Sequence, residues 1–359
     1  MRDGWIETTL GEVSESSWGN TEITKSKYVP TGFLAFSASG ADGFLDWFEH
    51  DTSAVILSAI GAQCGKTWFA SGRWTAIKNT IWLKSNGVSL SDKYLFYLSN
   101  TEHFWQIRGQ AQPFISLGDV KKKKLMLPPL AEQKRIVHLI SSVDSYIEAL
   151  QQQVDKARKS RNAVLHELLT KGGDGWVETK LGEICEIYQP KTIAKSLMND
   201  SGNYIVYGAN GPIGRFDEYN HENSEVVVTC RGATCGTVNK TPQKTWITGN
   251  AMVIKPKNDS LLRDFLFFSL TSYVDLRSCI SGSAQPQITR EGLSPQKILI
   301  PPLTEQKRIV EIISVFDNQI EALDSTIAKT KNLRSALLSD LLSGNHEIPT
   351  TYDKLIGAA

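Results

Sequence analysis

The sequence predicts a mixed α/β chain in which two domains of like fold are separated by two long helices, packed as an antiparallel coiled coil. Three observations lead to this prediction. One pattern of residues occurs twice in the 359-residue chain, each copy ends in an apolar repeat of about 3.5 residues, and strand-like runs precede a short helical run in each copy. The chain is therefore expected to be an internal duplication with approximate two-fold symmetry.

The duplication is visible in four matched segments, each separated from its twin by about 171–173 residues. The longest pairs 127–150 with 300–323, which are identical at 16 of 24 positions and share P-P-L-x-E-Q-K-R-I-V. Chance does not produce such a match at a fixed offset. The other three pairs are W-I-E-T-T-L-G-E at 5–12 with W-V-E-T-K-L-G-E at 176–183, G-A-Q-C-G at 61–65 with G-A-T-C-G at 232–236, and G-Q-A-Q-P at 109–113 with G-S-A-Q-P at 282–286.

The match between the copies is uneven. Residues 14–53 and 185–224 share little beyond scattered glycines. The copies therefore share a scaffold and differ in what it displays, which suggests two related domains with two different ligands. Neutral drift in surface loops is the alternative that the sequence leaves open.

A long helix is expected after each globular part. Pro128-Pro129 ends the first part, because proline cannot continue a strand ladder, and Glu132 then lies in a first helical turn, where the dipole favours an acid. Gly172-Gly173 and Gly344 are expected to end the helices. Each helix spans roughly 40 residues, or about 60 Å, so its apolar stripe needs the other helix or a partner. The short link at Gly172-Gly173 favours an antiparallel return.

The apolar seam of each helix is broken by an arginine at the same place, Arg161 in one copy and Arg334 in the other. Two alternatives remain open: a built-in polar layer, or a seam that shifts onto Leu165/Leu338 and Leu168/Leu341. The seam positions before the break are Ile136, Ile140, Val143, Ile147, Leu150, Val154 and Ala157, and Ile309, Ile313, Phe316, Ile320, Leu323, Ile327 and Thr330.

These boundaries predict five parts: a domain at 1–128, a helix at 129–173, a second domain at 174–301, a second helix at 302–344 and a polar tail at 345–359. The tail is expected either to be loosely ordered or to pack against the first domain.

Composition excludes several classes. At 41% apolar and 21% charged residues, the chain belongs with ordinary globular proteins. The sequence contains no run of 18 apolar residues, so neither a membrane span nor a membrane partner is expected. Five scattered cysteines without a C-x-x-C pair suggest neither a disulfide framework nor a zinc site, so a cytoplasmic location is expected. The formal charge of +1 neither supports nor excludes nucleic-acid binding.

Each domain is expected to hold a strand (52–57 and 224–229), a glycine-rich turn after it, and a short apolar helix (93–98 and 264–269). Polar side chains around these turns are candidates for ligand contact, because amides and guanidinium groups read base edges and lysines more often meet phosphate. The candidates are Ser39, Gln63, Lys66, Lys78 and Asn79 in the first copy and Asn210, Arg231, Thr234, Lys240 and Asn250 in the second.

The four lysines 121–124 admit two interpretations, a phosphate clamp or a solvated strand end. The second copy has only Lys297 there, which indicates that the run is not part of the shared scaffold.

No catalytic constellation is evident. The stretch 61–67 resembles a nucleotide-binding P-loop, but it has three residues between its glycines where that motif has four. The proline pairs lack the polar and aromatic neighbours of an adenine-methyltransferase loop, and no metal-ligand pattern occurs. Two rivals stay open: a scaffolding protein that binds peptide or glycan, and an enzyme that uses the near-P-loop.

The doubled P-P-L-x-E-Q-K-R-I-V helix starts, the two variable domains and the W-x-E-T-x-L-G-E openings together resemble the specificity subunits of type I restriction-modification systems. The resemblance covers residues 1–344. It implies a DNA-binding subunit without catalytic activity or a cofactor of its own, in which each domain reads one half of a split, asymmetric DNA site. The specificity subunit of a related type II system, working with a fused nuclease-methylase, is a close rival.

The resemblance also implies partners. Two methyltransferase subunits that use S-adenosylmethionine dock on the helices. The helices also fix the length of the spacer, the DNA between the two half-sites that neither domain reads. Separate restriction subunits use ATP and magnesium. The helix residues expected to contact a partner are Glu132, Gln133, Arg135, Glu305, Gln306 and Arg308. The bases of the target and the spacer length cannot be read from the sequence.

Overall fold

The computed structural model describes residues 4–282 and 285–357, and its tertiary contacts divide the chain into two compact units. Unit 1 contains Met1–Ala149 together with Ile327–Ala359, and unit 2 contains Leu150–Thr326. Each unit therefore holds one globular domain and a part of each long helix. The repeated G-S-A-Q-P segment lies partly outside the described residues, at 283–284, as do the last two residues of the predicted tail.

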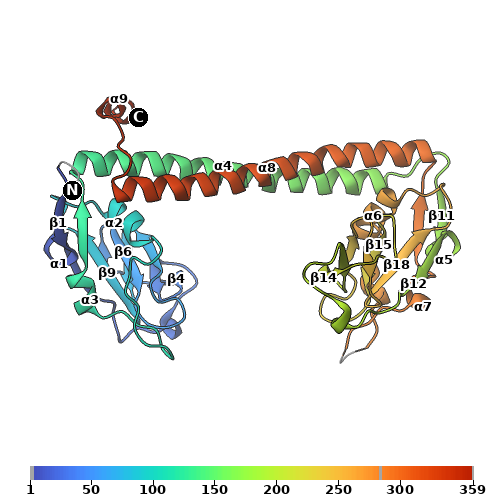
Figure 1. The fold of residues 1–359 in the computed structure, drawn as a ribbon, viewed down its shortest axis with the longest axis horizontal. Helices are drawn as coiled ribbons and strands as arrows, with labels where there is room; N and C mark the ends of the chain where they lie inside the picture. The colour runs from blue at the N-terminus through green and yellow to red at the C-terminus, as the bar shows by residue number, and fades with distance from the viewer. Residues whose placement is uncertain (1–3, 283–284, 358–359) are drawn as a thin grey trace. The chain divides into compact units, whose positions relative to one another are not determined.

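The domain of unit 1 is built on two small sheets (Figure 1). The first is antiparallel in the order β2-β9-β6-β7, and the second has the order β4-β3-β8-β5 with β3 and β8 parallel. Strand β6 is buried along its whole length and packs against helix α2 (Asp92–Ser99). The strands are β2 (Ser14–Trp18), β3 (Phe33–Ser37), β4 (Gly40–Leu45), β5 (His50–Asp51), β6 (Ala54–Ser58), β7 (Thr67–Ala70), β8 (Arg73–Ala76) and β9 (Thr80–Ser85).

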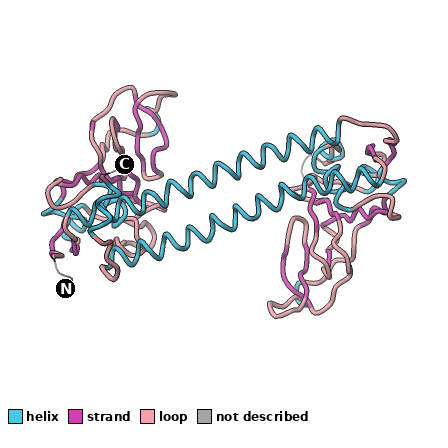
Figure 2. The backbone as a smooth tube through the Cα atoms, turned by 90° about the horizontal axis from the view of Figure 1, so that it is seen from above, coloured by secondary structure: helices cyan, strands magenta, loops and turns pink. Residues whose placement is uncertain are grey.

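The domain of unit 2 repeats this frame. Its sheets have the orders β12-β18-β15-β16 and β14-β13-β17, with β13 and β17 parallel, and helix α6 (Arg263–Ser272) takes the place of α2 (Figure 1). Strands and connecting loops make up most of each globular domain (Figure 2). The predicted mixed α/β class with two domains of like fold is confirmed. The strands are β12 (Cys185–Tyr188), β13 (Tyr204–Tyr207), β14 (Pro212–Phe216), β15 (Val226–Thr229), β16 (Val238–Lys240), β17 (Trp246–Ile247) and β18 (Ala251–Pro256).

Each repeated W-x-E-T-x-L-G-E opening forms a strand and one helical turn, and the strand pairs antiparallel with the strand that precedes the long helix. The leucine of the motif, Leu10 or Leu181, is fully buried. The elements are β1 (Ile6–Thr9), α1 (Leu10–Val13), α3 (Leu117–Lys122) and β10 (Lys124–Leu127) in unit 1, and β11 (Val177–Lys180), α5 (Leu181–Ile184), α7 (Arg290–Leu293) and β19 (Lys297–Ile300) in unit 2. The short remaining helices are η1 (Lys25–Lys27), η2 (Lys195–Leu197), η3 (Leu276–Cys279), η4 (Thr350–Tyr352) and α9 (Asp353–Ile356).

One lysine of the 121–124 run belongs to this shared frame. Lys124 Nζ lies 3.1 Å from Glu7 Oε1, and Lys297 Nζ lies 2.6 Å from Glu178 Oε1 in the equivalent strand pair. Only Lys124 thus has a counterpart in the second copy, which agrees with the prediction that the run as a whole is not part of the shared scaffold. Sequence reasoning missed this pair because the acidic partner lies more than 100 residues away.

Two helices of 41 residues, α4 (Leu130–Thr170) and α8 (Leu303–Ser343), follow the two domains. In unit 1 the start of α4 shares a core with the end of α8, and in unit 2 the end of α4 shares a core with the start of α8 (Figure 1). Starts therefore pack against ends, and the predicted antiparallel pairing is confirmed. Gly172 and Gly344, just beyond the helices, have φ values of +63° and +74°, which glycine adopts without strain.

The break in the seam is a polar layer in both units. In unit 2, Arg161 Nε and Nη2 lie 2.5 and 3.1 Å from the two carboxylate oxygens of Asp317, and the guanidinium lies over the ring of Phe268, 5.4 Å from its centroid. The leucine that follows, Leu165, is fully buried. The seam thus contains the predicted polar layer and then resumes on leucine. The predicted shift is confirmed in α8, where Leu338 and Leu341 are buried, but in α4 Leu169 is buried in place of the predicted Leu168.

Unit 1 repeats the layer with Arg334, which bonds both oxygens of Asp144 and lies over the ring of Tyr97. The Tyr97 hydroxyl donates to Asp144 Oδ2 at 3.1 Å. Burial and the neighbouring carboxylate of Asp144 raise the pKa of Tyr97 above its ordinary value, so the hydroxyl keeps its proton and the bond persists at neutral pH. Each layer therefore ties a long helix to the short helix of the domain in the same unit.

Replacing Asp317 by alanine should lower the free energy of unfolding of unit 2 by about 1–2 kcal/mol, because the Arg161 side chain, only 17% exposed, loses its carboxylate. Hydrogen exchange of the α4 amides around Arg161 measures this. The matched control is Asp324→Ala, whose partner Arg158 is 55% exposed and whose loss should cost no more than about 0.5 kcal/mol. Equal effects of the two substitutions would contradict the layer's stabilising role.

Candidate nucleic-acid interface

In unit 1, the turns that carry the predicted contact residues meet at one end of the two sheets. Strand β6 pairs with both β7 and β9, which brings the turn at 61–65 beside the turn before β9, and Ala59 N donates to Asn79 O at 2.9 Å. The β3–β4 turn reaches the same end, because a Cβ on Gly40 would lie 2.7 Å from the Trp68 indole nitrogen at the start of β7. The residues brought together are Ser39, Gln63, Lys66, Lys78 and Asn79.

These five residues differ in what they offer. Ser39, Lys66 and Lys78 are exposed, whereas Gln63 is half-buried. Asn79 has a φ of +71°, a left-handed conformation that asparagine tolerates better than most residues, so it also forms the turn itself. The exposed groups make this end of the domain a polar surface with two lysines.

In unit 2, four of the five predicted residues meet at the equivalent end. Cys230 N donates to Asn250 O at 3.1 Å, which joins the β15–β16 turn to the turn before β18. The Thr229 hydroxyl donates to Ala209 O at 2.5 Å and so holds the β13–β14 turn beside them. The four exposed residues at this end are Asn210, Arg231, Thr234 and Asn250.

Lys240 does not lie with these four. It pairs with Val226 at the start of β15, the opposite end of β16 from the turn, and its Nζ forms an ion pair with Asp264 of α6. The expectation that Lys240 belongs to the same polar surface is wrong, because the residue follows the turn by a full strand.

The G-x-A-Q-P segments, which carried no prediction, support the turns. Gly61 N donates to Pro113 O at 2.9 Å, and in unit 2 Gly232 N donates to Pro286 O at 3.1 Å. The repetition of the motif in both copies was the signal that this segment belongs to the shared frame. Each turn is therefore held on its flank by a loop from the end of its own domain.

Unit 2 also has a polar cleft of about 430 Å³ beside its turn. Arg231 lines it together with Gln189, Gln287 and Arg290. The Gln189 amide nitrogen donates to Gly249 O at 3.1 Å, which fixes that side chain at the rim. Sequence reasoning missed the last three residues, because Gln189 lies 42 residues before Arg231 and Gln287 and Arg290 lie 56 and 59 residues after it, and none of them stands in a turn with a repeated pattern.

The near-P-loop is a hairpin turn. Gly61 and Gly65 have φ values of +104° and +92°, and the segment joins the antiparallel strands β6 and β7. A P-loop joins a strand to a helix whose N-terminus faces the phosphates, and here a strand follows instead. The nucleotide-binding alternative for this segment is therefore not supported.

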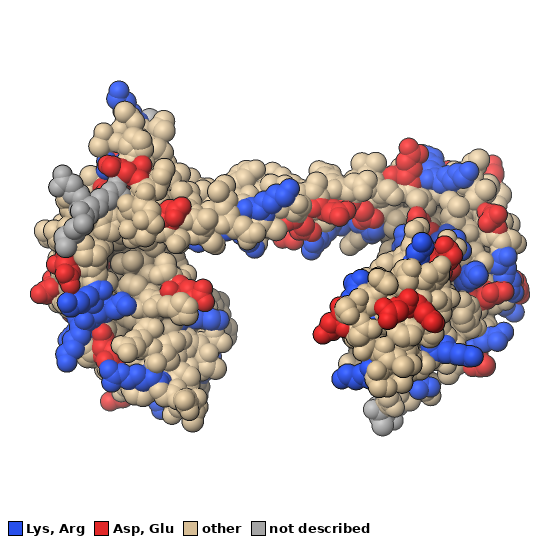
Figure 3. All heavy atoms as spheres, viewed as in Figure 1, with Lys and Arg blue, Asp and Glu red and all other residues tan. Residues whose placement is uncertain are grey.

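The described residues contain neither a metal-ligand group nor a membrane-spanning helix. Among residues 4–282 and 285–357, no three His, Cys, Asp or Glu side chains are grouped as a metal site would require. In the same part of the chain, no helix is both long and apolar enough to span a membrane. On the face drawn in Figure 3, basic and acidic side chains are interspersed in both units.

Two of the residues expected to contact a partner are fully buried. Gln133 accepts a bond from Ser91 N at 3.0 Å and donates to the carbonyl oxygens of Ser89 and Pro128. Gln306 makes the three equivalent bonds in unit 2. Both side chains act inside their own unit, where they tie the start of a long helix to the start of α2 or α6. Because both side chains are fully buried, the expectation that Gln133 and Gln306 contact a partner is wrong.

The remaining helix residues differ between the units. In unit 1, Glu132 and Arg135 are nearly buried, and Arg135 Nη1 lies 3.0 Å from Asp353 Oδ2 in the tail. In unit 2, Arg308 is exposed and pairs with Glu305 at 3.1 Å. The tail thus packs against the first unit, which was one of the two predicted alternatives.

Known proteins share this organisation. The family model for the type I restriction modification DNA specificity domain matches residues 2–157 and 173–331. The specificity subunit of the type I restriction enzyme MjaVIII from Methanocaldococcus jannaschii is 24% identical over 334 residues, covering 81% of this chain and 78% of that protein.

Two solved structures share the fold. The crystal structure of a type I restriction-modification system S subunit from M. genitalium matches with a TM-score of 0.65 at 18% identity, over 94% of this chain and 96% of that one. A chain from a structural study of complex assembly and conformational transition in the type I R-M system matches with a TM-score of 0.59 at 22% identity, over 95% of this chain and 98% of that one.

Proposed function

Because the chain belongs to the family of type I restriction-modification DNA specificity domains, we propose that it recognises double-stranded DNA as the specificity subunit of a type I restriction-modification complex. In this proposal, each globular domain reads one half of a split, asymmetric site. The two long helices set the length of the unread spacer and dock two modification subunits.

One observation carries the proposal: two frames of similar topology present different polar turns at equivalent ends. The frame is held by repeated residues, such as the buried Leu10 and Leu181, while the turn residues differ. Amide, hydroxyl and guanidinium groups are those that distinguish base edges in the major groove. The residues proposed to contact DNA are Ser39, Gln63, Lys66, Lys78, Asn79, Asn210, Arg231, Thr234 and Asn250.

Catalysis is assigned to the partners. We infer that modification subunits carry S-adenosylmethionine and methylate adenine, that restriction subunits use ATP and magnesium, and that this chain contributes recognition alone, in the cytoplasm. Support comes from the names of its relatives, which are specificity subunits, and from a structural neighbour solved in a study of complex assembly. A gel shift with random double-stranded DNA, run with and without a methyltransferase partner, tests DNA binding directly. Absence of a shift in both conditions would contradict the proposal.

Replacing Arg231 by alanine should relax recognition at one or two base pairs of a single half-site. A bidentate arginine–guanine contact contributes about 1–3 kcal/mol of discrimination, so the preferred base should lose roughly 5- to 150-fold of its advantage. Sequencing of methylated sites in the assembled complex measures this. The half-site read by the other domain should stay unchanged, because its turns lie in unit 1.

Lys240→Ala is the matched control, since this cation belongs to the same domain but lies at the opposite end of the sheet. It should leave both half-sites unaltered. A uniform loss of affinity across all sequences in the Arg231 variant would instead identify a phosphate contact. Relaxation of both half-sites would contradict the assignment of one half-site to each domain.

A further inference from the structure

The two long helices begin with the same residues, but the starts of the two helices lie in different surroundings. Each start carries a proline, a glutamate and an arginine at equivalent positions, Pro129, Glu132 and Arg135 in unit 1. In unit 1 the C-terminal tail covers this place: Ile348 is 4% exposed and joins the core that contains the helix ends. The Arg135 side chain is consequently only 7% exposed.

The tail is held by three kinds of contact. The Ile348 side chain is buried, the Tyr352 hydroxyl lies 3.0 Å from His138 Nδ1, and the Asp353 carboxylate lies 3.0 and 3.3 Å from Arg135 Nη1. An aliphatic anchor is thus followed, four and five residues later, by a tyrosine and a carboxylate. This order describes the chemistry that the start of α4 accepts.

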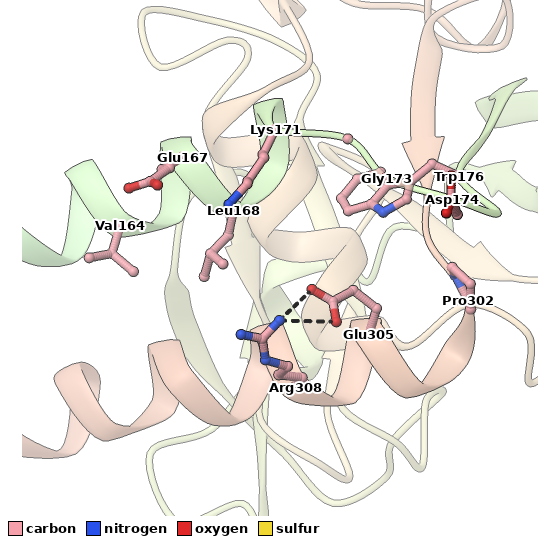
Figure 4. A pocket seen from close by; sticks show the side chains of 11 residues that line it. Val164, Glu167, Leu168, Lys171, Gly173, Asp174, Trp176, Pro302, Glu305 and Arg308 are labelled. Atoms are coloured by element: carbon pink, nitrogen blue, oxygen red, sulfur yellow. Dashed lines mark hydrogen bonds and ion pairs between the residues drawn. The ribbon is translucent and has the colours of Figure 1, made fainter.

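Unit 2 has a groove at the equivalent place, with a volume of about 500 Å³ (Figure 4). Leu168 of α4, Trp176 and Pro302 give it an apolar wall, and Lys171, Glu305 and Arg308 supply charge. The Arg308 side chain is 64% exposed, against 7% for its twin in unit 1. Its guanidinium pairs with Glu305 of the same helix, a short-range pair that a stronger carboxylate partner can replace.

The connection of the chain explains why none of the described residues fills the groove. Helix α4 ends at Thr170, and only a few residues lead to β11, which begins at Val177. Four residues of this link, Gly172, Gly173, Asp174 and Trp176, line the groove themselves, so the link forms its wall and does not fill it. Helix α8 ends at Ser343 and is followed by a segment that is described through Gly357. That segment is engaged in unit 1.

We propose that the groove of unit 2 binds a segment of a partner polypeptide with the chemistry of this chain's own tail. The segment presents a large aliphatic side chain to the apolar wall, followed by a carboxylate that pairs with Arg308 and lies near Lys171. In unit 1 the equivalent arginine, Arg135, already holds such a carboxylate. His138, which contacts the tail's Tyr352, is replaced by Glu311 in unit 2, so the proposed segment needs the aliphatic group and the carboxylate but not the tyrosine. This proposal goes beyond DNA recognition and does not depend on it.

A labelled peptide of residues 345–357 (N-H-E-I-P-T-T-Y-D-K-L-I-G), titrated into the full chain and followed by fluorescence anisotropy, tests the proposal. One peptide should bind per chain. Arg308→Ala should weaken binding at least tenfold, and a peptide with Asp353→Asn should bind comparably weakly. Lys307→Ala, a neighbouring exposed cation that does not line the groove, should stay within twofold. A chain that ends at Gly344 should bind two peptides, because its unit 1 site is vacated.

Three results would overturn the proposal. One is no saturable binding to the full chain. The second is equal binding by the wild type and by Arg308→Ala. The third concerns self-association: if sedimentation shows a dimer of the full chain that Arg308→Ala abolishes, the groove holds the tail of a second copy and not a partner's segment. Because the Arg308 side chain is largely exposed, its substitution leaves the fold intact, and circular dichroism of the variant checks this.

Discussion

Replacing Gln306 by alanine should lower the free energy of unfolding of unit 2 by about 2–4 kcal/mol, because three partly or fully buried hydrogen bonds to the backbone are lost at once. The fully buried side chain accepts a bond from Leu262 N at 2.9 Å and donates to Ser260 O at 2.8 Å and Pro301 O at 3.0 Å. Leu262 is the N-cap of α6 and offers no capping side chain, and Gln306 accepts the backbone N–H of this cap residue, the group that the N3 side chain of a capping box would otherwise accept. Thermal unfolding combined with hydrogen exchange in α6 measures the loss.

Its controls come from the same chain. Gln319→Ala, on an exposed position of the same helix, should change stability by less than about 0.5 kcal/mol. Gln133→Ala, the twin, should destabilise unit 1 by a similar amount and leave α6 protected. If the free energy of unfolding of Gln306→Ala lies within about 1 kcal/mol of the wild-type value, the loss corresponds to about one hydrogen bond, and the buried amide is replaceable.

Features that depend on local pattern could be predicted from the sequence. The 3.5-residue seam requires residues such as Ile136 and Ile309 to be buried, and both are. Proline before the helix and Gly172 after it limited α4 to within a few residues. The hairpin turns followed from glycines beside a buried strand, and most of the candidate contact residues are gathered there because strand pairing brings neighbouring turns to one end.

Features that depend on distant partners could not be predicted. Gln133 stands in a helix with charged neighbours, and nothing nearby in the sequence shows that its amide bonds to residues 42 and 44 positions earlier. Lys240 was placed by its distance from a turn in the sequence, but β16 carries it to the other end of the sheet. The tail's attachment to Arg135 depends on an acid more than 200 residues later. Each case required the tertiary pairing before the role of the side chain could be assigned.

Inserting four residues after Ala149 in α4, with a matching insertion after Ala322 in α8, should change the spacer of the recognised DNA site by one or two base pairs and leave both half-sites unchanged. Four residues add one helical turn, about 6 Å, and base pairs are spaced by about 3.4 Å. Both positions are exposed, and coiled coils absorb four-residue insertions by local unwinding. Neither globular domain is touched, so the turns at the polar ends keep their geometry. Sequencing of the sites methylated by the assembled complex measures the spacer.

The matched control changes helix composition without changing length: Gln151, Gln152 and Gln153, all exposed on α4, are replaced together by alanine. Since alanine favours the helix and the seam is untouched, the spacer should stay as in the wild type. An insertion protein that still methylates DNA at the original spacing would show that the helices do not determine the spacer. Altered half-sites at an altered spacing would show that helix length also governs how the domains present their turns, which contradicts separate roles for helix and domain.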